Sequence, residues 1–210
     1  MKLINREIAE YTESFTSKES KTLKELVRVS EKELEFIDML SGPQVGKLLN
    51  MLVQISGAKR ILEVGTFTGY SAIWMADALP DDGTLITLEM NERYRDISKP
   101  FFERESYQNK IKQKMGNALE VIPTLSGKFD LIFLDADKIS YPTYYEMLKP
   151  KLRSGGILVI DNVLWDGYVL RPSSEKSRAI HKLNKMVRDD KDVEQVMIPV
   201  RDGITIVRKK

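Results

Sequence analysis

Acidic, amide and small residues follow five short apolar runs of this sequence. They are Glu63, Gly65 and Gly69, then Glu89, then Gly116, Asn117 and Ala118, then Asp135 and Asp137, and finally Asp161 and Asn162. Carboxylate and amide oxygens accept hydrogen bonds from sugar hydroxyls and bind hard cations, and a glycine lets the backbone approach a ligand. Taken singly, any one of these residues more often belongs to a turn or caps a helix than binds a ligand. Their recurrence after five consecutive runs indicates one polar binding site.

The five runs alternate with helix-like segments, an arrangement typical of a parallel sheet. The predicted strands are RILEV, TLITLE, KIKQKM, FDLIFLD and GILVID, which begin at residues 60, 84, 110, 129 and 156. The carboxyl ends of parallel strands meet at one edge of the sheet, where ligands of open α/β sheets bind, so we expect the polar residues to converge there. The closing runs 193–200 and 203–209, joined by Arg201-Asp202, predict an antiparallel hairpin.

We expect one α/β domain with two regions. A chain of 210 residues with 42% hydrophobic residues suits a single core. Residues 1–56 carry apolar side chains at helical spacing, namely Leu23, Leu26, Val27, Leu34 and Ile37. This predicts a helical N-terminal region that covers the active site or a dimer interface, followed by a cofactor-binding core at residues 57–210.

Composition narrows the functional classes. With 33 basic and 31 acidic residues the net charge is +2, so no large positive field indicates nucleic acid or an anionic membrane as a partner. The absence of cysteine excludes disulfides, thiolate zinc sites and a cysteine nucleophile. No apolar run reaches the roughly 18 residues of a membrane span, and the polar start is unlike a signal peptide, so we expect a cytoplasmic protein. The single histidine, His181, is expected at the surface.

The residues after the first two runs are typical of a nucleoside site. Gly65 lets the backbone approach a ligand, and Glu89, 24 positions later, stands where a strand-end acid accepts hydrogen bonds from ribose hydroxyls. Residues 61–71, ILEVGTFTGYS, match neither the Gly-x-Gly-x-x-Gly motif of dinucleotide-binding folds nor a phosphate-binding loop. Glu63 beside the turn would repel a pyrophosphate and would suit an ammonium or sulfonium group. The pattern therefore predicts a cationic nucleoside.

Six segments together resemble one enzyme family: EVGTFTGYS, LITLEM, GNALEVIP, FDLIFLDADKISY, GGILVIDNVLWDG and PVRDGITIVRK. They are similar to the metal-dependent small-molecule O-methyltransferases, the family of catechol and caffeoyl-CoA O-methyltransferases, from about Ser41 to the C-terminus. The resemblance implies a Rossmann-like methyltransferase fold, with a seven-stranded, mostly parallel sheet, an antiparallel C-terminal strand and helices on both faces. It also implies S-adenosylmethionine, a divalent cation (Mg²⁺ before Mn²⁺ or Ca²⁺) and a homodimer.

The resemblance also implies roles for single residues. The implied cofactor-binding residues are Ser41, Glu63, Gly65, Thr66, Ser71, Glu89, Ala118, Asp135 and Asp137. Glu63 would stand near the methionine and ribose side, Ser71 would hold the carboxylate, and Glu89 would take the ribose hydroxyls. Ala118 would border the adenine through its backbone.

The implied metal ligands are Asp135, Asp161 and Asn162, whose hard oxygens suit a magnesium-like ion. The two oxygens of a catechol-like vicinal diphenol can chelate such an ion, which activates one of them for methylation. Lys138 matches the family's lysine that accepts the proton from the acceptor hydroxyl. The implied acceptor is therefore a phenolic small molecule, and the residues on its side are Trp165 and Asp166.

Three other functions stay open. A nicotinamide-dependent oxidoreductase shares the strand pattern, although the glycine spacing disfavours it. A methyltransferase of another acceptor class, such as RNA, shares the cofactor, although the sequence has no Asn-Pro-Pro-Tyr motif and no strong basic patch. A non-catalytic protein that binds S-adenosylmethionine is disfavoured by the intact catalytic and metal residues.

We expect several large side chains to pack in the core, either as their main role or as an alternative to a functional one. Trp165 is equally expected in the core. The remaining large side chains expected to pack in the interior are Tyr141, Tyr144, Tyr145, Met39, Met51 and Met75.

Overall fold

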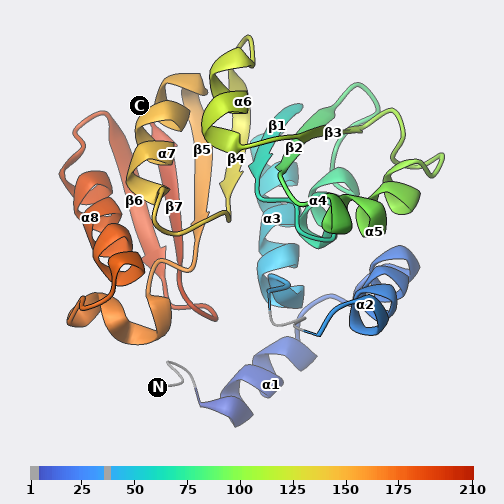
Figure 1. Ribbon diagram of the computed structural model, residues 1–210, viewed down its shortest axis with the longest axis horizontal. Coiled ribbons are helices and arrows are strands. Elements are labelled where there is room, and N and C mark those ends of the chain that lie inside the picture. The colour runs from blue at the N-terminus through green and yellow to red at the C-terminus, as the bar shows by residue number, and fades with distance from the viewer. Residues whose placement is uncertain (1–4, 36–38) are drawn as a thin grey trace.

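The computed structural model describes residues 5–35 and 39–210 and contains a seven-stranded sheet in the order β3-β2-β1-β4-β5-β7-β6 (Figure 1). The strands are β1 Arg60–Val64, β2 Thr84–Glu89, β3 Ile111–Met115, β4 Phe129–Leu134, β5 Leu152–Asp161, β6 Val193–Ile198 and β7 Ile204–Lys209. Strands β1 to β5 are parallel, and β7 runs antiparallel to both β5 and β6. The predicted strands, the closing hairpin and the mostly parallel sheet are confirmed.

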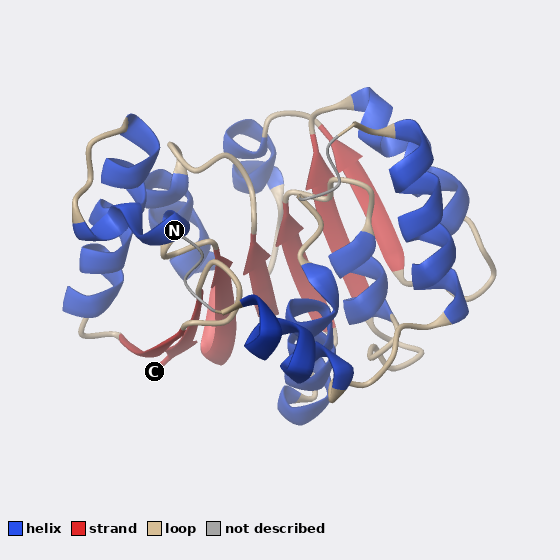
Figure 2. Ribbon diagram, turned by 90° about the horizontal axis from the view of Figure 1, so that it is seen from below, coloured by secondary structure: helices blue, strands red, loops and turns tan. Residues whose placement is uncertain are grey.

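Helices connect the strands and precede the sheet. They are α1 Arg6–Ser14, α2 Lys21–Glu33, α3 Gly42–Ser56, α4 Tyr70–Ala76, α5 Glu92–Phe102, α6 Ala118–Thr124, α7 Tyr141–Leu148 and α8 Glu175–Asp189, with 3₁₀ turns η1 Lys149–Lys151 and η2 Trp165–Leu170. The helices cover both faces of the sheet (Figure 2). Among the residues described, no helix is both long and apolar enough to cross a bilayer.

Alternate residues of each central strand are buried on opposite faces, as the period of a β-strand requires. In β4, Leu131 and Phe133 join the core formed with α2 to α5, whereas Ile132 and Leu134 join the core formed with α6 to α8. Burial on both faces explains why the central strands read as continuous apolar runs. The layering places the carboxyl ends of β1, β2, β4 and β5 along one edge of the sheet.

Within residues 5–35 and 39–56, the N-terminal region contains the helices α1, α2 and α3. Leu23 and Leu26 of α2 are fully buried, and Leu34, just after the helix, packs against the same core. Ile37 lies outside the described residues. Helix α3 approaches α4 closely because it has a glycine at the contact: a Cβ on Gly46 would lie 2.2 Å from Trp74 Cδ1.

Two of the three methionines assigned to the core are exposed, so that prediction was wrong for them. Met75 is fully buried, but Met39 is 55% exposed and Met51 is 47% exposed. The buried stripe of α3 contains Leu49 and Val53, and Met51, midway between them in sequence, points away from it. Met39 precedes α3 and lines a cavity, so its apolar side chain faces an opening.

Candidate active site

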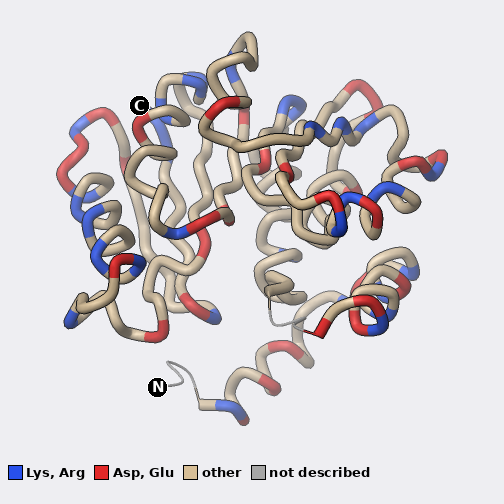
Figure 3. Tube along the Cα trace, in the orientation of Figure 1, with Lys and Arg blue, Asp and Glu red and all other residues tan. Residues whose placement is uncertain are grey.

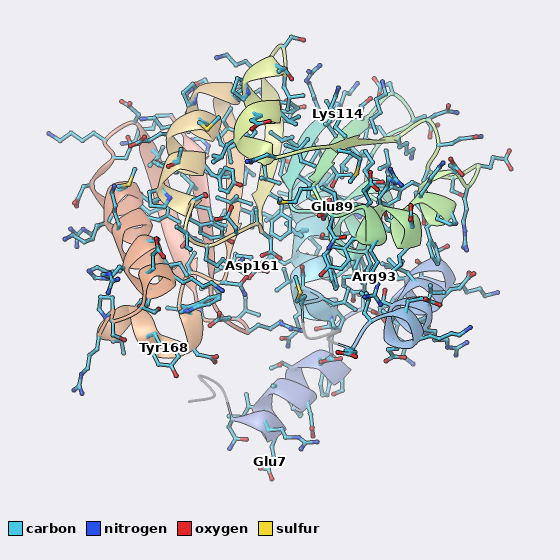
Figure 4. All side chains as sticks on the ribbon, in the orientation of Figure 1. Glu7, Glu89, Arg93, Lys114, Asp161 and Tyr168 are labelled. Carbon is cyan, nitrogen blue, oxygen red and sulfur yellow. The ribbon has the colours of Figure 1, made fainter. Side chains whose placement is uncertain are left out.

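A cavity of about 830 Å³ opens at the carboxyl ends of β1, β2, β4 and β5. This is the edge at which β1 and β4 lie side by side while their connections leave in opposite directions, the usual ligand position in open α/β sheets. The cavity brings together most predicted site residues: Ser41, Gly65, Thr66, Ser71, Glu89, Ala118, Asp135, Asp137, Lys138, Asp161, Asn162 and Trp165. Figure 4 labels Glu89 and Asp161, which end β2 and β5 on either side of β1 and β4.

The turn after β1 is held close to the end of β4. Gly65 has φ +100°, and a Cβ at this position would lie 1.9 Å from the carbonyl oxygen of Asp135. Only glycine combines this backbone conformation with so close an approach. The N–H groups of Gly65 and Thr66 both donate to the carbonyl of Leu88, at 3.1 Å each. The turn is therefore anchored to β2 and β4, and its backbone forms one wall of the cavity.

The carboxylate of Glu89 is fixed by three backbone N–H groups. Oε2 accepts from Phe67 at 2.8 Å, and Oε1 accepts from Met90 and Asn91 at 2.9 Å each. Asn91 caps α5, so the same short segment ends β2, orients the carboxylate and begins the next helix. A carboxylate has about four lone-pair sites, so Glu89 can still accept hydrogen bonds from a ligand in the cavity.

Glu63 does not line the cavity, in contrast to its expected place beside the cofactor. Its side chain is fully buried, where Oε1 accepts from the Ser71 hydroxyl and Oε2 from the Thr87 hydroxyl, both at 2.5 Å. Thr87 is in turn 2.5 Å from the hydroxyl of Thr66. Burial raises the pKa of Glu63 to about 8, although both hydroxyl contacts oppose the rise. Glu63 therefore acts on the cavity through Ser71 and Thr66, which do line it.

Lys138 lies between an acid and a buried phenol. Its Nζ donates to Asp135 Oδ1 at 2.6 Å and to the Tyr141 hydroxyl at 2.7 Å. The hydroxyl of Tyr141 itself donates to the carbonyl of Asp161 at 3.1 Å. Tyr141 is fully buried in α7, so packing is confirmed, but its hydroxyl also connects the ends of β4 and β5.

Asp161 and Asn162 end β5 at the same cavity. Asp161 Oδ1 accepts the N–H of Asn162 at 2.7 Å, and Asn162 has φ +58°. Burial, and next the negative charge of Asp135, raise the pKa of Asp161 to about 7. Two neighbouring carboxylates, together with an amide oxygen, form a donor set that a hard divalent cation fits. Among the residues described, no group of three or more His, Cys, Asp or Glu side chains gathers as a metal site.

The remaining predicted residues differ in how they meet the cavity. Asp137 accepts from the backbone N–H of Ser140 at 3.0 Å and from the Tyr144 hydroxyl at 2.9 Å, so it also fixes the start of α7. Ser41 is buried at the start of α3, and its side chain does not cap that helix. Ala118 begins α6, whose cap is the side chain of Asn117.

Trp165 and Asp166 adopt left-handed backbone conformations in η2, with φ +47° and +50°. Trp165 packs against the core beside α8 and also lines the cavity. Asp166 is exposed, its N–H donates to Asp202 Oδ1 at 2.6 Å, and it does not line the cavity. Its expected place beside the substrate is therefore not reproduced by the cavity.

Sequence reasoning missed several residues of the cavity wall. They are Leu40, Phe67, Tyr70, Met90, Tyr94, Ile139, Lys176 and Arg201. Met90 directly follows Glu89, so its place after a strand end was a usable signal. Lys176 and Arg201 lie in α8 and in the turn between β6 and β7, where no local pattern relates them to the strand ends.

Comparison with known proteins places the chain among methyltransferases. The O-methyltransferase family matches residues 13–210. Caffeoyl-CoA O-methyltransferase 1 of Zea mays is 35% identical over an alignment of 206 residues, and the match covers 91% of this chain and 80% of the relative. Tricin synthase 2 of Oryza sativa subsp. japonica is 36% identical, over 91% of this chain and 70% of the relative.

A solved structure gives the same answer. The O-methyltransferase TomG from Streptomyces achromogenes, involved in tomaymycin synthesis and crystallised in complex with SAM, superposes with a TM-score of 0.89 at 30% identity, covering 97% of this chain and 96% of TomG. The chain therefore belongs to the O-methyltransferase family and has the fold of S-adenosylmethionine-dependent methyltransferases.

Proposed function

We propose that this S-adenosylmethionine-dependent O-methyltransferase methylates one hydroxyl of a vicinal diphenol, with a divalent cation held by Asp135, Asp161 and Asn162. The observation that carries the proposal is the meeting of Lys138 with these three residues in one cavity, beside the Gly65 turn. A vicinal diphenol has the two adjacent oxygens that such a site accommodates.

The cofactor end of the cavity lies along β1 and β2. Glu89, oriented by three backbone N–H groups, accepts hydrogen bonds from the ribose hydroxyls. The backbone at Gly65 and Thr66 passes close to the cofactor, and Ser71 binds its carboxylate. Ser41, Ala118 and Asp137 complete this end of the site.

The acceptor end lies along β4 and β5. A divalent cation bound here would supply Lewis-acid stabilisation of negative charge on the acceptor oxygens. The residues suit it because their donors are hard oxygens and because the negative charge of Asp135 disfavours ionisation of Asp161, which a cation would offset. Trp165 provides an aromatic wall for the acceptor ring.

Lys138 accepts the proton of the hydroxyl that becomes methylated. In its amine form, Nζ takes that proton, and the acceptor oxygen then bonds to the methyl carbon as the carbon–sulfur bond electrons return to sulfur. Asp135 and Tyr141 hold Nζ in place from two sides. Asp135 also stabilises the ammonium that results.

The test compares a vicinal diphenol with the matching monophenol, with and without chelator. We expect methyl transfer from S-adenosylmethionine to the diphenol, a far lower rate on the monophenol, and loss of turnover after exhaustive chelation that added Mg²⁺ restores. Circular dichroism should show an unchanged fold in chelator, because the cation serves the acceptor and not the core. Equal rates on both acceptors, or full activity in chelator, would refute the proposal.

The chain is also proposed to form a homodimer. Helix α1 has no buried residue; its apolar side chains Ile8 and Tyr11 are 57% and 63% exposed, and Phe15, directly after the helix, is 76% exposed. A second copy that covers them would remove this apolar surface from water. Light scattering should give the mass of two chains, and an Ile8→Glu, Phe15→Glu double variant should shift it to one. An unshifted mass would place the interface elsewhere, and a monomeric wild type would refute the dimer.

A further inference from the structure

Two basic residues of the cavity form no ion pair with any other residue that the structure describes. The cavity is lined by Lys138, Lys176 and Arg201. Lys138 is paired with Asp135, but within residues 5–35 and 39–210 neither Lys176 nor Arg201 takes part in an ion pair. Acidic and basic positions are interspersed over most of the fold (Figure 3), so unpaired charges of one sign at a cavity need a reason.

Arg201 is held in place by its surroundings. It lies in the turn between β6 and β7 with φ +49°, a conformation that non-glycine residues rarely adopt. Its Nη2 donates to the carbonyl of Leu40 at 3.1 Å. A Cβ on Gly42 would lie 1.9 Å from Nη1, so the guanidinium rests on the backbone at the start of α3. Only one of its five N–H groups is used in this contact, which leaves donors for a ligand.

Arg201 lines the same cavity as Asp161, which ends β5. The guanidinium and the acceptor end of the site therefore face one space.

Lys176 stands beside the aromatic wall of the same end. It lies in the first turn of α8, and its Nζ is 5.8 Å from the centroid of the Trp165 ring. An acceptor ring packed against Trp165 therefore has an ammonium group beside it. Trp165 and Lys176 both line the cavity, so the ammonium group of Lys176 is available to a ligand there.

The distribution of charge favours one class of acceptor. In the proposed function, Glu89 serves the ribose, and Asp135 and Asp161 serve the divalent cation. Lys176 and Arg201 are then left facing the acceptor. They would repel a cationic side chain and bind a neutral one weakly, whereas a carboxylate can bind both through charge-assisted hydrogen bonds, with the planar guanidinium suited to two parallel ones.

We propose that Lys176 and Arg201 form a subsite for an anionic group, and that the acceptor is a vicinal diphenol whose side chain ends in a carboxylate. This inference rests on the proposed function for the acceptor class. It adds the residues that select among vicinal diphenols.

The test uses acceptors that differ only in side-chain charge. They are 3-(3,4-dihydroxyphenyl)propionate, its primary amide and 3-(3,4-dihydroxyphenyl)propylamine, whose saturated linkers keep the ring electronics alike. We expect kcat/KM for the acid to exceed that for the amide by about tenfold, and the amine to be poorer still. The preference should shrink in 0.5 M salt, because exposed charges are screened. The coenzyme A thioester of the acid is included, since its phosphates are a second source of negative charge.

Charge variants assign the preference to these residues. Lys176→Glu should reverse the order of acid and amine, and Arg201→Gln should bring the ratio of acid to amide toward one. Lys182→Glu, on α8 but outside the cavity, is the matched control and should leave the wild-type ratio unchanged. If Arg201→Gln fails to fold, because it loses the contact with Leu40, Lys176→Glu alone still decides the proposal.

The outcomes separate this inference from the proposed function. Turnover of acid and amide with equal kcat/KM overturns the subsite and leaves the function intact, and a preference that follows the thioester overturns the carboxylate assignment. Absence of turnover on all acceptors overturns the function. The subsite is then decided by calorimetric titration of the propionate and its amide into the protein with S-adenosylhomocysteine: weaker binding of the acid to Lys176→Glu supports it, and equal binding of acid and amide to the wild type refutes it.

Discussion

Lys138 Nζ lies 2.6 Å from Asp135 Oδ1, and both side chains face the cavity at the end of β4. The same nitrogen lies 2.7 Å from the hydroxyl of Tyr141. Two residues three positions apart in one loop thus bring a candidate base beside a candidate metal ligand. The buried phenol of Tyr141 fixes the direction of the Lys138 side chain. The geometry predicts that experiments can distinguish the roles of the two residues: Lys138 in proton transfer and Asp135 in cation binding.

Replacing Lys138 with Met should remove the base and leave the cofactor site intact. We expect kcat to fall by about 10²- to 10⁴-fold while the affinity for S-adenosylmethionine stays near normal. Higher pH should partly restore the rate, because more of the acceptor is then deprotonated in solution. Steady-state rates of methyl transfer, measured across pH with Lys182→Met as the matched control, test this prediction. Wild-type turnover of the variant at neutral pH would show that Lys138 is not the base.

Replacing Glu89 with Ala should weaken binding of S-adenosylmethionine. The loss of charged hydrogen bonds to the ribose should cost about 1.5 to 3 kcal/mol, or roughly ten- to more than a hundredfold in Kd. The substitution also frees the N–H groups of Phe67, Met90 and Asn91, so part of the loss comes from a less ordered loop. Calorimetry measures the effect, and Glu92→Ala, exposed at the start of α5, is the control. Unchanged affinity in a folded Glu89→Ala protein would move the ribose elsewhere.

The buried carboxyl of Glu63 should make the stability of the protein depend on pH. Its pKa rises from 4.5 in the unfolded chain to about 8 in the fold, chiefly by burial. Between these values the folded state keeps a proton that the unfolded chain has lost. Its contribution to stability is therefore complete below about pH 4.5 and lost as pH rises toward 8, by at most about 1.4 kcal/mol per pH unit.

Glu63→Gln removes this titration but can keep the contacts with Ser71 and Thr87, whose hydroxyls can donate or accept. We expect the stability of the variant, measured by urea unfolding, to gain on that of the wild type as pH rises from 5 to 8. Glu31→Gln, at an exposed position of α2, should show no such trend. A constant difference between Glu63→Gln and wild type over this range would show that Glu63 is charged throughout.

Two glycine substitutions should differ sharply in cost. Gly65→Ala meets both a φ of +100° and a contact of 1.9 Å with the carbonyl oxygen of Asp135, and should destabilise the fold by about 3 kcal/mol or more. Gly57→Ala has φ +62° with no heavy atom within 4 Å of the added Cβ, and should cost only about 1 kcal/mol. Urea unfolding of both variants checks this. Equal losses would mean that the turn moves away from β4 at little cost.

Much of the fold followed from local patterns. Strands β1, β2, β4 and β5 were predicted from apolar runs, because burial on both faces leaves a continuous signal in the sequence. The hairpin of β6 and β7 followed from two runs joined by a short turn. The meeting of Glu89, Asp135 and Asp161 was also predictable, since parallel strands bring their carboxyl ends to one edge whatever the details of packing.

Side-chain direction was not predictable from the same patterns. Glu63 ends a strand like the other acids, yet its carboxylate is buried with Thr87 and Ser71 instead of facing the cavity. The choice depends on hydroxyl partners that β2 and α4 bring to it, and those partners are 24 and 8 positions away. Met51 shows the same limit, because the buried face of α3 was decided by where α4 and the sheet lie.

The sequence by itself determined the strands, their polar ends and the family to which the chain belongs, because each is written in short segments whose pattern is local. Only the tertiary structure decided which residues from distant segments join the site. Lys176 and Arg201 come from α8 and the last turn, yet they line the same cavity as Gly65, more than a hundred positions away. Such convergence depends on how α8 and the β6–β7 hairpin pack against the sheet, a property of the whole chain that no local pattern of residues records.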